Sequence, residues 1–112
     1  MTTLRNSVHL IGRLGNDPEM KNFGNDRSMA RFSLATDDYY RDSEGKQTKE
    51  TQWHNIVAWG KTAEIAEKIL SKGKEAAIHG KLVNRSWEDK EGTKHYITEV
   101  VVSEIMAFGK DS

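Results

Sequence analysis

Apolar and polar side chains alternate along most of this chain, which is typical of β-strands that bury one face and expose the other. In residues 29–36, for example, Ala30, Phe32 and Leu34 share one face and Arg31 lies on the opposite face. The same pattern predicts five strands in all, at residues 7–14, 29–36, 51–59, 76–87 and 94–108.

One segment departs from this alternation and predicts a helix over residues 61–72. Its apolar residues recur at helical spacing and form a single stripe, made of Ile65, Ala66, Ile69 and Leu70. Gly73 stands where a C-terminal cap is expected, and Lys68 and Lys72 lie near the negative end of the helix dipole.

Turn-forming residues separate the predicted strands. Gly12 interrupts the first strand, as glycine does at a bend of a barrel, and residues 15–18 (GNDP) form a turn. The polar stretch 37–50, with Gly45 near its tip, predicts a long hairpin loop or a pair of extended arms, and residues 89–93 predict a charged hairpin turn. Three strands, one helix and two strands are the element order of a five-stranded OB-fold barrel, an all-β class with one helix, although several small α+β folds share this order.

The composition indicates one soluble domain without disulfides. The 112 residues suffice for a single core, and 36% hydrophobic and 30% charged residues exclude a disordered or a membrane protein. The chain has no cysteine, and residues 1–6 lack the apolar segment of a signal peptide. We therefore expect a cytoplasmic protein, with one domain over residues 1–109 and a short remnant at 110–112.

The three tryptophans carry the main functional signal. Trp53 and Trp59 lie six residues apart in one strand, so both project from the same face, with Asn55 between them. The opposite face is compact enough to fill a barrel, which leaves both indoles outside the core. An exposed indole is a stacking platform for unpaired nucleobases, and each stack contributes about 1–3 kcal/mol.

Basic residues accompany the aromatic ones, although 17 basic and 17 acidic residues give the whole chain a net charge of zero. Trp87 shares its face with Arg85 and Lys81, and Arg31 also falls on an outward strand face. These cations are candidates for phosphate contacts. The predicted nucleic-acid-binding residues are thus Trp53, Trp59, Trp87, Tyr39, Tyr40, Arg31, Arg85, Lys81 and Asn55.

The sequence contains no recognisable catalytic or metal-binding motif. Residues 55–62 (NIVAWGKT) place Gly-Lys-Thr between a strand and a helix, but a P-loop requires glycine where Asn55 stands. The four histidines have neither close metal-ligand spacing nor cysteine partners. We expect no enzyme activity, no cofactor and no metal.

Several segments resemble the bacterial single-stranded DNA-binding protein family, in register from about residue 6 to residue 108. They are VHLIGRLGNDPE at 8–19, FSLAT at 32–36, QWHNIVAWGKTAE at 52–64, GKL at 80–82, RSW at 85–87 and TEVVV at 98–102. The resemblance implies an OB fold, usually a homotetramer, that binds single-stranded DNA during replication, recombination and repair. It places stacking aromatics at Trp53, Trp59, Trp87 and Tyr40 and a subunit contact near His54, and we assign His9 to the oligomer interface as well.

The family generally carries a further segment that this sequence lacks. That segment is a long Gly/Pro/Gln-rich tail with an acidic, aromatic tip, which recruits replication and repair proteins, whereas this sequence ends with GKDS at 109–112. The sequence is then either that of a naturally short member or one from which the tail was left out, so recruitment of partners through such a tail is not carried over.

Two other interpretations lead to different expectations. An accessory module of the same fold, such as a primosome component that bridges proteins, predicts weak DNA binding and a dimer. A purely structural oligomerisation domain would bury its tryptophans at subunit contacts, and their fluorescence would not respond to DNA. RNA binding also stays open, because stacking tolerates either sugar.

Overall fold

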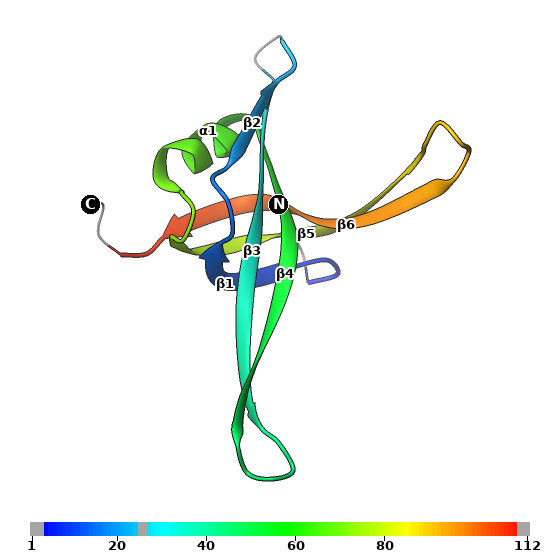
Figure 1. The fold of residues 1–112 in the computed structure, drawn as a ribbon. Coiled ribbons are helices and arrows are strands. Elements are labelled where there is room, and N and C mark those ends of the chain that lie inside the picture. The colour runs from blue at the N-terminus through cyan, green and yellow to red at the C-terminus, as the bar shows by residue number, and fades with distance from the viewer. Residues whose placement is uncertain (1–3, 25–26, 110–112) are drawn as a thin grey trace.

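The computed structural model describes residues 4–24 and 27–109, and they form a β-barrel from which two long hairpins project (Figure 1). The expectations for the first three residues and for the remnant at 110–112 lie outside the described residues. In chain order the elements are β1 (Val8–Leu14), β2 (Glu19–Asn22), β3 (Ser28–Arg41), β4 (Gln47–Trp59), α1 (Gly60–Ile69), β5 (Glu75–Glu88) and β6 (Lys94–Ala107).

Five strands close the barrel in the order β1-β5-β6-β4-β3, and β3 returns to pair with β1. The closing contact is short, with Arg13 opposite Ala35 and Leu14 opposite Leu34. All neighbours are antiparallel except β4 and β6, which pair in parallel. The predicted five-stranded OB barrel is therefore confirmed, and a short strand that we did not predict, β2, extends the sheet beside β3.

The core follows from the alternation along each strand. In β3 the side chains of Ala30, Phe32 and Leu34 are buried, whereas Arg31 and Ser33 between them remain partly exposed. In β4, Ile56 and Ala58 of the inward face are fully buried, and Val57 of the outer face is buried as well, at 2% exposure. Residues from every barrel strand and from α1 meet in this core: Leu14, Ala30, Phe32, Leu34, Ile56, Ala58, Ala63, Ala66, Leu70, Ala76, Ile78, Val100 and Val102.

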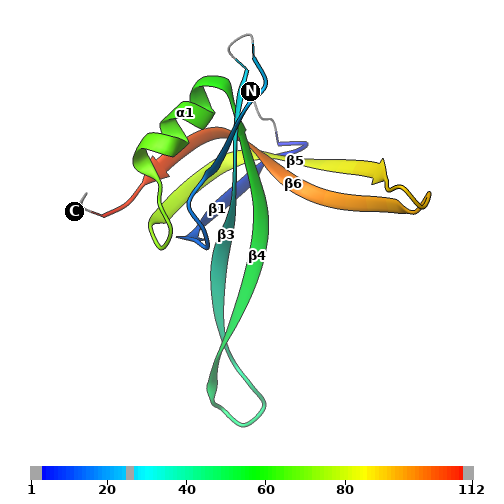
Figure 2. The same ribbon diagram turned by 45° about the horizontal axis from the view of Figure 1, so that its top comes forward.

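The polar stretch predicted as a loop or a pair of arms is a paired ribbon. β3 and β4 stay in register as far as Arg41 opposite Gln47, and β5 and β6 as far as Glu88 opposite Lys94. Figures 1 and 2 show both hairpins extending well beyond the barrel in different directions. The barrel thus carries two arms, the β3–β4 arm and the β5–β6 arm.

The helix differs from its prediction in three respects. It spans Gly60–Ile69 and begins and ends earlier than expected, with Leu70 as an extended C-cap residue. Ile65 is 48% exposed, because Ala63 and Ala66 are the helical residues that face the barrel. Gly73 is not the cap; it has a φ of 86° in the turn before β5, where the amide of Lys74 donates to the carbonyl of Ser71.

Candidate nucleic-acid interface

Strand register brings most of the predicted binding residues onto one outer face of the barrel, formed by β3, β4, β6 and β5. Arg31 lies opposite Val57, and Asn55 lies opposite both Ser33 and Glu99. Residues that face each other in neighbouring strands share a face of the sheet. We call this surface the β3–β5 face; its outward residues include Trp53, Asn55, Val57 and Trp59 of β4, Arg31 of β3, Glu99 and Val101 of β6, and Lys81, Val83, Arg85 and Trp87 of β5.

All three indoles are exposed, as the parity of the strands predicts. The exposed fractions are 62% for Trp53, 41% for Trp59 and 46% for Trp87. Large aromatic rings left in contact with water usually mark a surface that another molecule covers. Within this chain, therefore, the tryptophans do not serve as core residues.

A groove of about 460 Å³ crosses the β3–β5 face next to Trp59. Its floor is apolar, with Val57 and Val101, and its rim is basic. The lining residues are Lys21, Phe23, Met29, Arg31, Val57, Trp59, Val83, Arg85, Glu99 and Val101. The groove thus combines an aromatic wall with cations, which suits a base and its phosphate.

Sequence reasoning missed Phe23, which extends the aromatic wall. Its ring is 56% exposed, and its centroid lies 6.1 Å from that of Trp59 with a 31° tilt between the planes. Phe23 follows β2, a strand of four residues. Four residues are too few for a periodicity signal, so only the fold places this ring beside Trp59.

Sequence reasoning also missed Glu99, which lies between the two predicted phosphate-binding arginines. Its carboxylate accepts hydrogen bonds from Arg85, at 3.0 Å from Nε and 3.2 Å from Nη2, and lies 3.2 Å from Nη2 of Arg31. The hydrogen bond to Glu99 raises the pKa of Arg85 further above the physiological range. Both guanidinium groups are therefore held at one point of the face.

The loop after β1 supports Trp53. Asn16 Oδ1 accepts hydrogen bonds from the backbone amide and the hydroxyl of Ser33, which fixes the loop against β3. Gly15 then lies directly under the indole, so that a Cβ at this position would stand 2.5 Å from Cζ3 of Trp53. Position 15 therefore accepts only glycine without displacing this ring.

Trp87 is held on the β5–β6 arm by neighbours on both strands. The guanidinium of Arg85 lies 5.7 Å from the indole centroid, and the ring of His95 stacks at 5.3 Å with a 21° tilt. His95 Nε2 in turn contacts Asp89 at 2.8 Å. Hydrogen bonds from His95 and from the amides of Thr93 and Glu91 lower the pKa of Asp89, so this carboxyl is charged at neutral pH.

The two tyrosines lie in the outer part of β3, where a loop was predicted to begin. They pair with Lys49 and Thr48 of β4 and are 62% and 49% exposed for Tyr39 and Tyr40. Successive residues of a strand point to opposite faces. The β3–β4 arm therefore offers one ring on each side.

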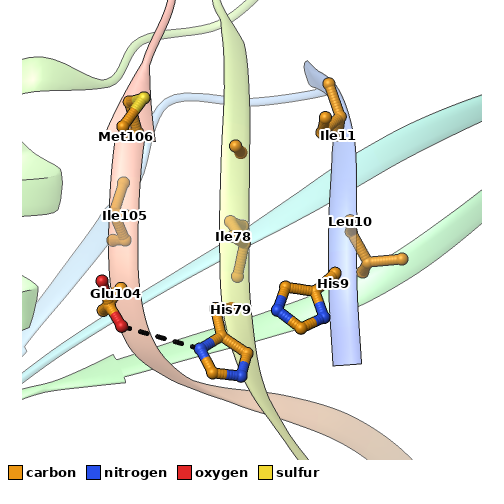
Figure 3. A pocket seen from close by; sticks show the side chains of 9 residues that line it. His9, Leu10, Ile11, Ile78, His79, Glu104, Ile105 and Met106 are labelled. Carbon is orange, nitrogen blue, oxygen red and sulfur yellow. Dashed lines mark ion pairs between the residues drawn. The ribbon is translucent and has the colours of Figure 1, made fainter. Parts of the chain in front are cut away.

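The two histidines assigned to an oligomer interface lie in different surroundings. His54 is half-buried in β4, and one of its ring nitrogens hydrogen-bonds the hydroxyl of Thr36 at 2.9 Å. His9 is exposed on β1 and stacks on His79 of β5, with centroids 4.2 Å apart and a 4° tilt. Figure 3 shows this stack with Glu104, whose carboxylate lies 3.7 Å from Nδ1 of His79.

Neither a metal centre nor a membrane helix is found in the described part of the chain. No group of three or more histidine, cysteine, aspartate or glutamate side chains is placed to hold a metal ion within residues 4–24 and 27–109. Over the same residues, no helix has the length and apolar character needed to span a bilayer.

A family model described as the single-strand binding protein family matches residues 5–108. The chain belongs to this family. It is 47% identical over 109 residues to single-stranded DNA-binding protein 1 of Chlorobaculum tepidum. The matched segment covers 96% of this chain and 67% of that protein. Membership also confirms the expectation of a DNA-binding protein that is not an enzyme.

Two solved structures of family members share the fold. Plasmodium falciparum SSB in complex with ssDNA is 31% identical, with a TM-score of 0.83 over 97% of this chain and 98% of that chain. A deletion mutant of the single-stranded DNA-binding protein from Thermus aquaticus is 27% identical, with a TM-score of 0.80 over 93% of this chain. This chain spans only 50% of the Thermus aquaticus chain.

Proposed function

We propose that this protein binds and protects single-stranded DNA through the β3–β5 face and its two arms, with little sequence preference, during replication, recombination and repair. The observation that carries the proposal is the presence of three exposed indoles and two paired arginines on one continuous face. Both classes of contact that hold a single strand, stacking and phosphate neutralisation, are thus available together.

The geometry favours a single strand over a duplex. Trp53, Trp59 and Trp87 can stack only on bases whose π-faces are accessible, and in a duplex those faces are covered by neighbouring base pairs. Every base has such a face, so stacking discriminates little between sequences. Arg31, Arg85 and Lys81 would contact the phosphates, which makes the affinity depend on salt.

We also propose that the protein assembles as a homotetramer, whose subunits meet through β1 and the sheet beside it. Within the described residues, β1 pairs with β3 only at Arg13 and Leu14, so its edge over residues 8–12 is left without a strand on that side. An open strand edge is a template for another strand. A second copy that adds its own β1 in antiparallel fashion would satisfy this edge symmetrically.

The outer surface of β1, β5 and β6 is a suitable second contact between copies. It carries a groove of about 230 Å³ lined by His9, Leu10, Ile11, Ala77, Ile78, His79, Glu104, Ile105 and Met106 (Figure 3). Ile11 and Met106 are each 61% exposed there, on the sheet that continues the β1 edge. Sedimentation equilibrium at micromolar concentration should give the mass of four chains; a single-chain mass would contradict this assembly.

Titration of the intrinsic tryptophan fluorescence with oligo(dT) tests the binding proposal. We expect strong quenching that weakens as salt rises, because bases cover the three indoles and salt competes for the phosphates. Duplex DNA of equal nucleotide content is the control and should quench far less. Indifference to both would instead favour the structural oligomerisation domain, and weak binding by a dimer would favour the accessory module.

We place this activity in the bacterial cytoplasm, with the nucleoid. The similar protein from the bacterium Chlorobaculum tepidum supports this location, and so does the proposed ligand, because single strands arise where a chromosome is replicated and repaired.

A further inference from the structure

Glu99 is the one fully buried charged side chain among the described residues, and it lies in the middle of the proposed DNA-binding face. It is 4% exposed, while the arginines beside it, Arg31 and Arg85, are 39% and 47% exposed. A carboxylate in the surface that meets a polyanion opposes binding by its charge. Its presence there therefore needs another reason.

Its hydrogen bonds indicate that reason. Oε1 and Oε2 of Glu99 accept hydrogen bonds from Nε and Nη2 of Arg85, and Oε2 also forms an ion pair with Nη2 of Arg31. Charge-assisted, bidentate contacts of this kind are among the strongest and most directional in proteins. A buried carboxylate is stable only when it is paired in this way. The two guanidinium groups, from β3 and β5, are thereby fixed across the two strands between them, β4 and β6.

The pairing also sets the charge of the cluster. Two guanidinium cations and one carboxylate leave a net charge of +1, in place of +2 for two free arginines. Arg85 keeps its Nη1 edge outside the bidentate contact, and the exposed parts of both side chains face the groove. A single DNA strand therefore meets two immobilised hydrogen-bond donors whose cluster carries a net charge of only +1.

We propose that Glu99 is a positioning residue that limits the salt sensitivity of DNA binding: it holds Arg31 and Arg85 in place and cancels one of their two charges. This inference rests on the proposed function. Pre-positioned donors lose less conformational freedom when the strand binds. The lower net charge means that fewer counterions are released, so the complex weakens less as salt rises.

The Glu99→Gln variant tests the charge. The slope of log K against log salt for oligo(dT) should become steeper by about 0.7, the value expected for one more neutralised phosphate on a single strand. The variant should bind as tightly as the wild type or more tightly at low salt, and more weakly at high salt, where the loss of arginine positioning dominates. An unchanged slope would overturn the proposal.

Two further variants separate charge from geometry. Combining Glu99→Gln with Arg85→Gln restores the net charge of +1, so its slope should return to the wild-type value. Glu99→Asp keeps the charge but shortens the reach, so its slope should match the wild type while its affinity falls by the same factor at every salt concentration. A double variant whose slope stays steep, or an aspartate variant with wild-type affinity throughout, would contradict the assigned role.

A measurement on the unmodified protein covers the case in which the Gln variant does not fold. The ¹⁵N relaxation of the Arg85 Nε–H group should show a side chain as rigid as the backbone around it, in contrast to that of exposed Arg5. Equal mobility of the two would overturn the proposal. If the wild type binds no oligo(dT) at any salt concentration, the proposed function itself fails, which is a different outcome from binding with unchanged slopes.

Discussion

Replacing Trp53 with alanine should weaken binding to oligo(dT) by about 5- to 150-fold. One base–indole stack contributes about 1–3 kcal/mol, and each 1.4 kcal/mol corresponds to a factor of ten in affinity. The ring is 62% exposed and rests on Gly15, so its loss removes a stacking platform without opening a cavity in the core. The measurement is a fluorescence-anisotropy titration with labelled oligo(dT), after the melting temperature confirms the fold.

Tyr96→Ala is the matched control for this substitution. Tyr96 is also a large exposed aromatic, at 74%, but it pairs with Ser86 and so lies on the side of the β5–β6 arm opposite Trp87. Its loss should change the affinity less than twofold. If both alanine variants lose affinity equally, exposure rather than position on the β3–β5 face would determine binding, and the proposed interface would be wrong.

Replacing Gly12 with alanine should lower the free energy of unfolding by about 3 kcal/mol, the upper end of the usual cost of overpacking. A Cβ at this position would stand 2.0 Å from the carbonyl oxygen of Ala35 and 2.8 Å from its carbon. Both are backbone atoms of β3, and the β3–β4 ladder fixes them. The only relief is to separate β1 from β3, which opens the barrel at its shortest closing contact.

Gly45→Ala separates this clash from the general cost of replacing glycine. Gly45 has a φ of 83° at the tip of the β3–β4 arm, and nothing lies within 4 Å of a Cβ built there. Its substitution should cost about 1–2 kcal/mol, from the left-handed backbone alone. Urea unfolding measures the loss of unfolding free energy in both variants, provided that the m-value stays the same as in the wild type. Equal losses would mean that the barrel absorbs the Gly12 clash.

A chain of zero net charge can bind a polyanion because its charges are sorted by position. The β3–β5 face gathers Arg31, Arg85 and Lys81 and also contains the paired carboxylate of Glu99, whereas several other carboxylates lie in the turns, such as Asp89 in the β5–β6 arm. The field near the strand depends on the local arrangement rather than on the sum over the chain. Total charge therefore gave no indication of function here, while strand parity did.

Five of the six strands, the inward-facing core residues of the barrel and the exposure of the tryptophans follow from the sequence alone. These are local properties, because side chains in a strand alternate with a period of two whatever the strand packs against. An even spacing therefore keeps Trp53 and Trp59 on one face in any β fold. The family motifs added the order in which the strands close into a barrel.

The pairing of the β3–β4 arm, the buried side of the helix and the groove became visible only in the tertiary structure. The outer β3–β4 arm is polar and is held by backbone pairing, so it leaves no hydrophobic pattern to read, whereas the predicted bounds of the β5–β6 strands agree with the structure to within one residue. Ile65 fits the helical stripe, but the barrel meets the alanines of α1 instead. Phe23 and Glu99 gain their places from strands that lie far apart in the chain, and such contacts form only when the barrel closes.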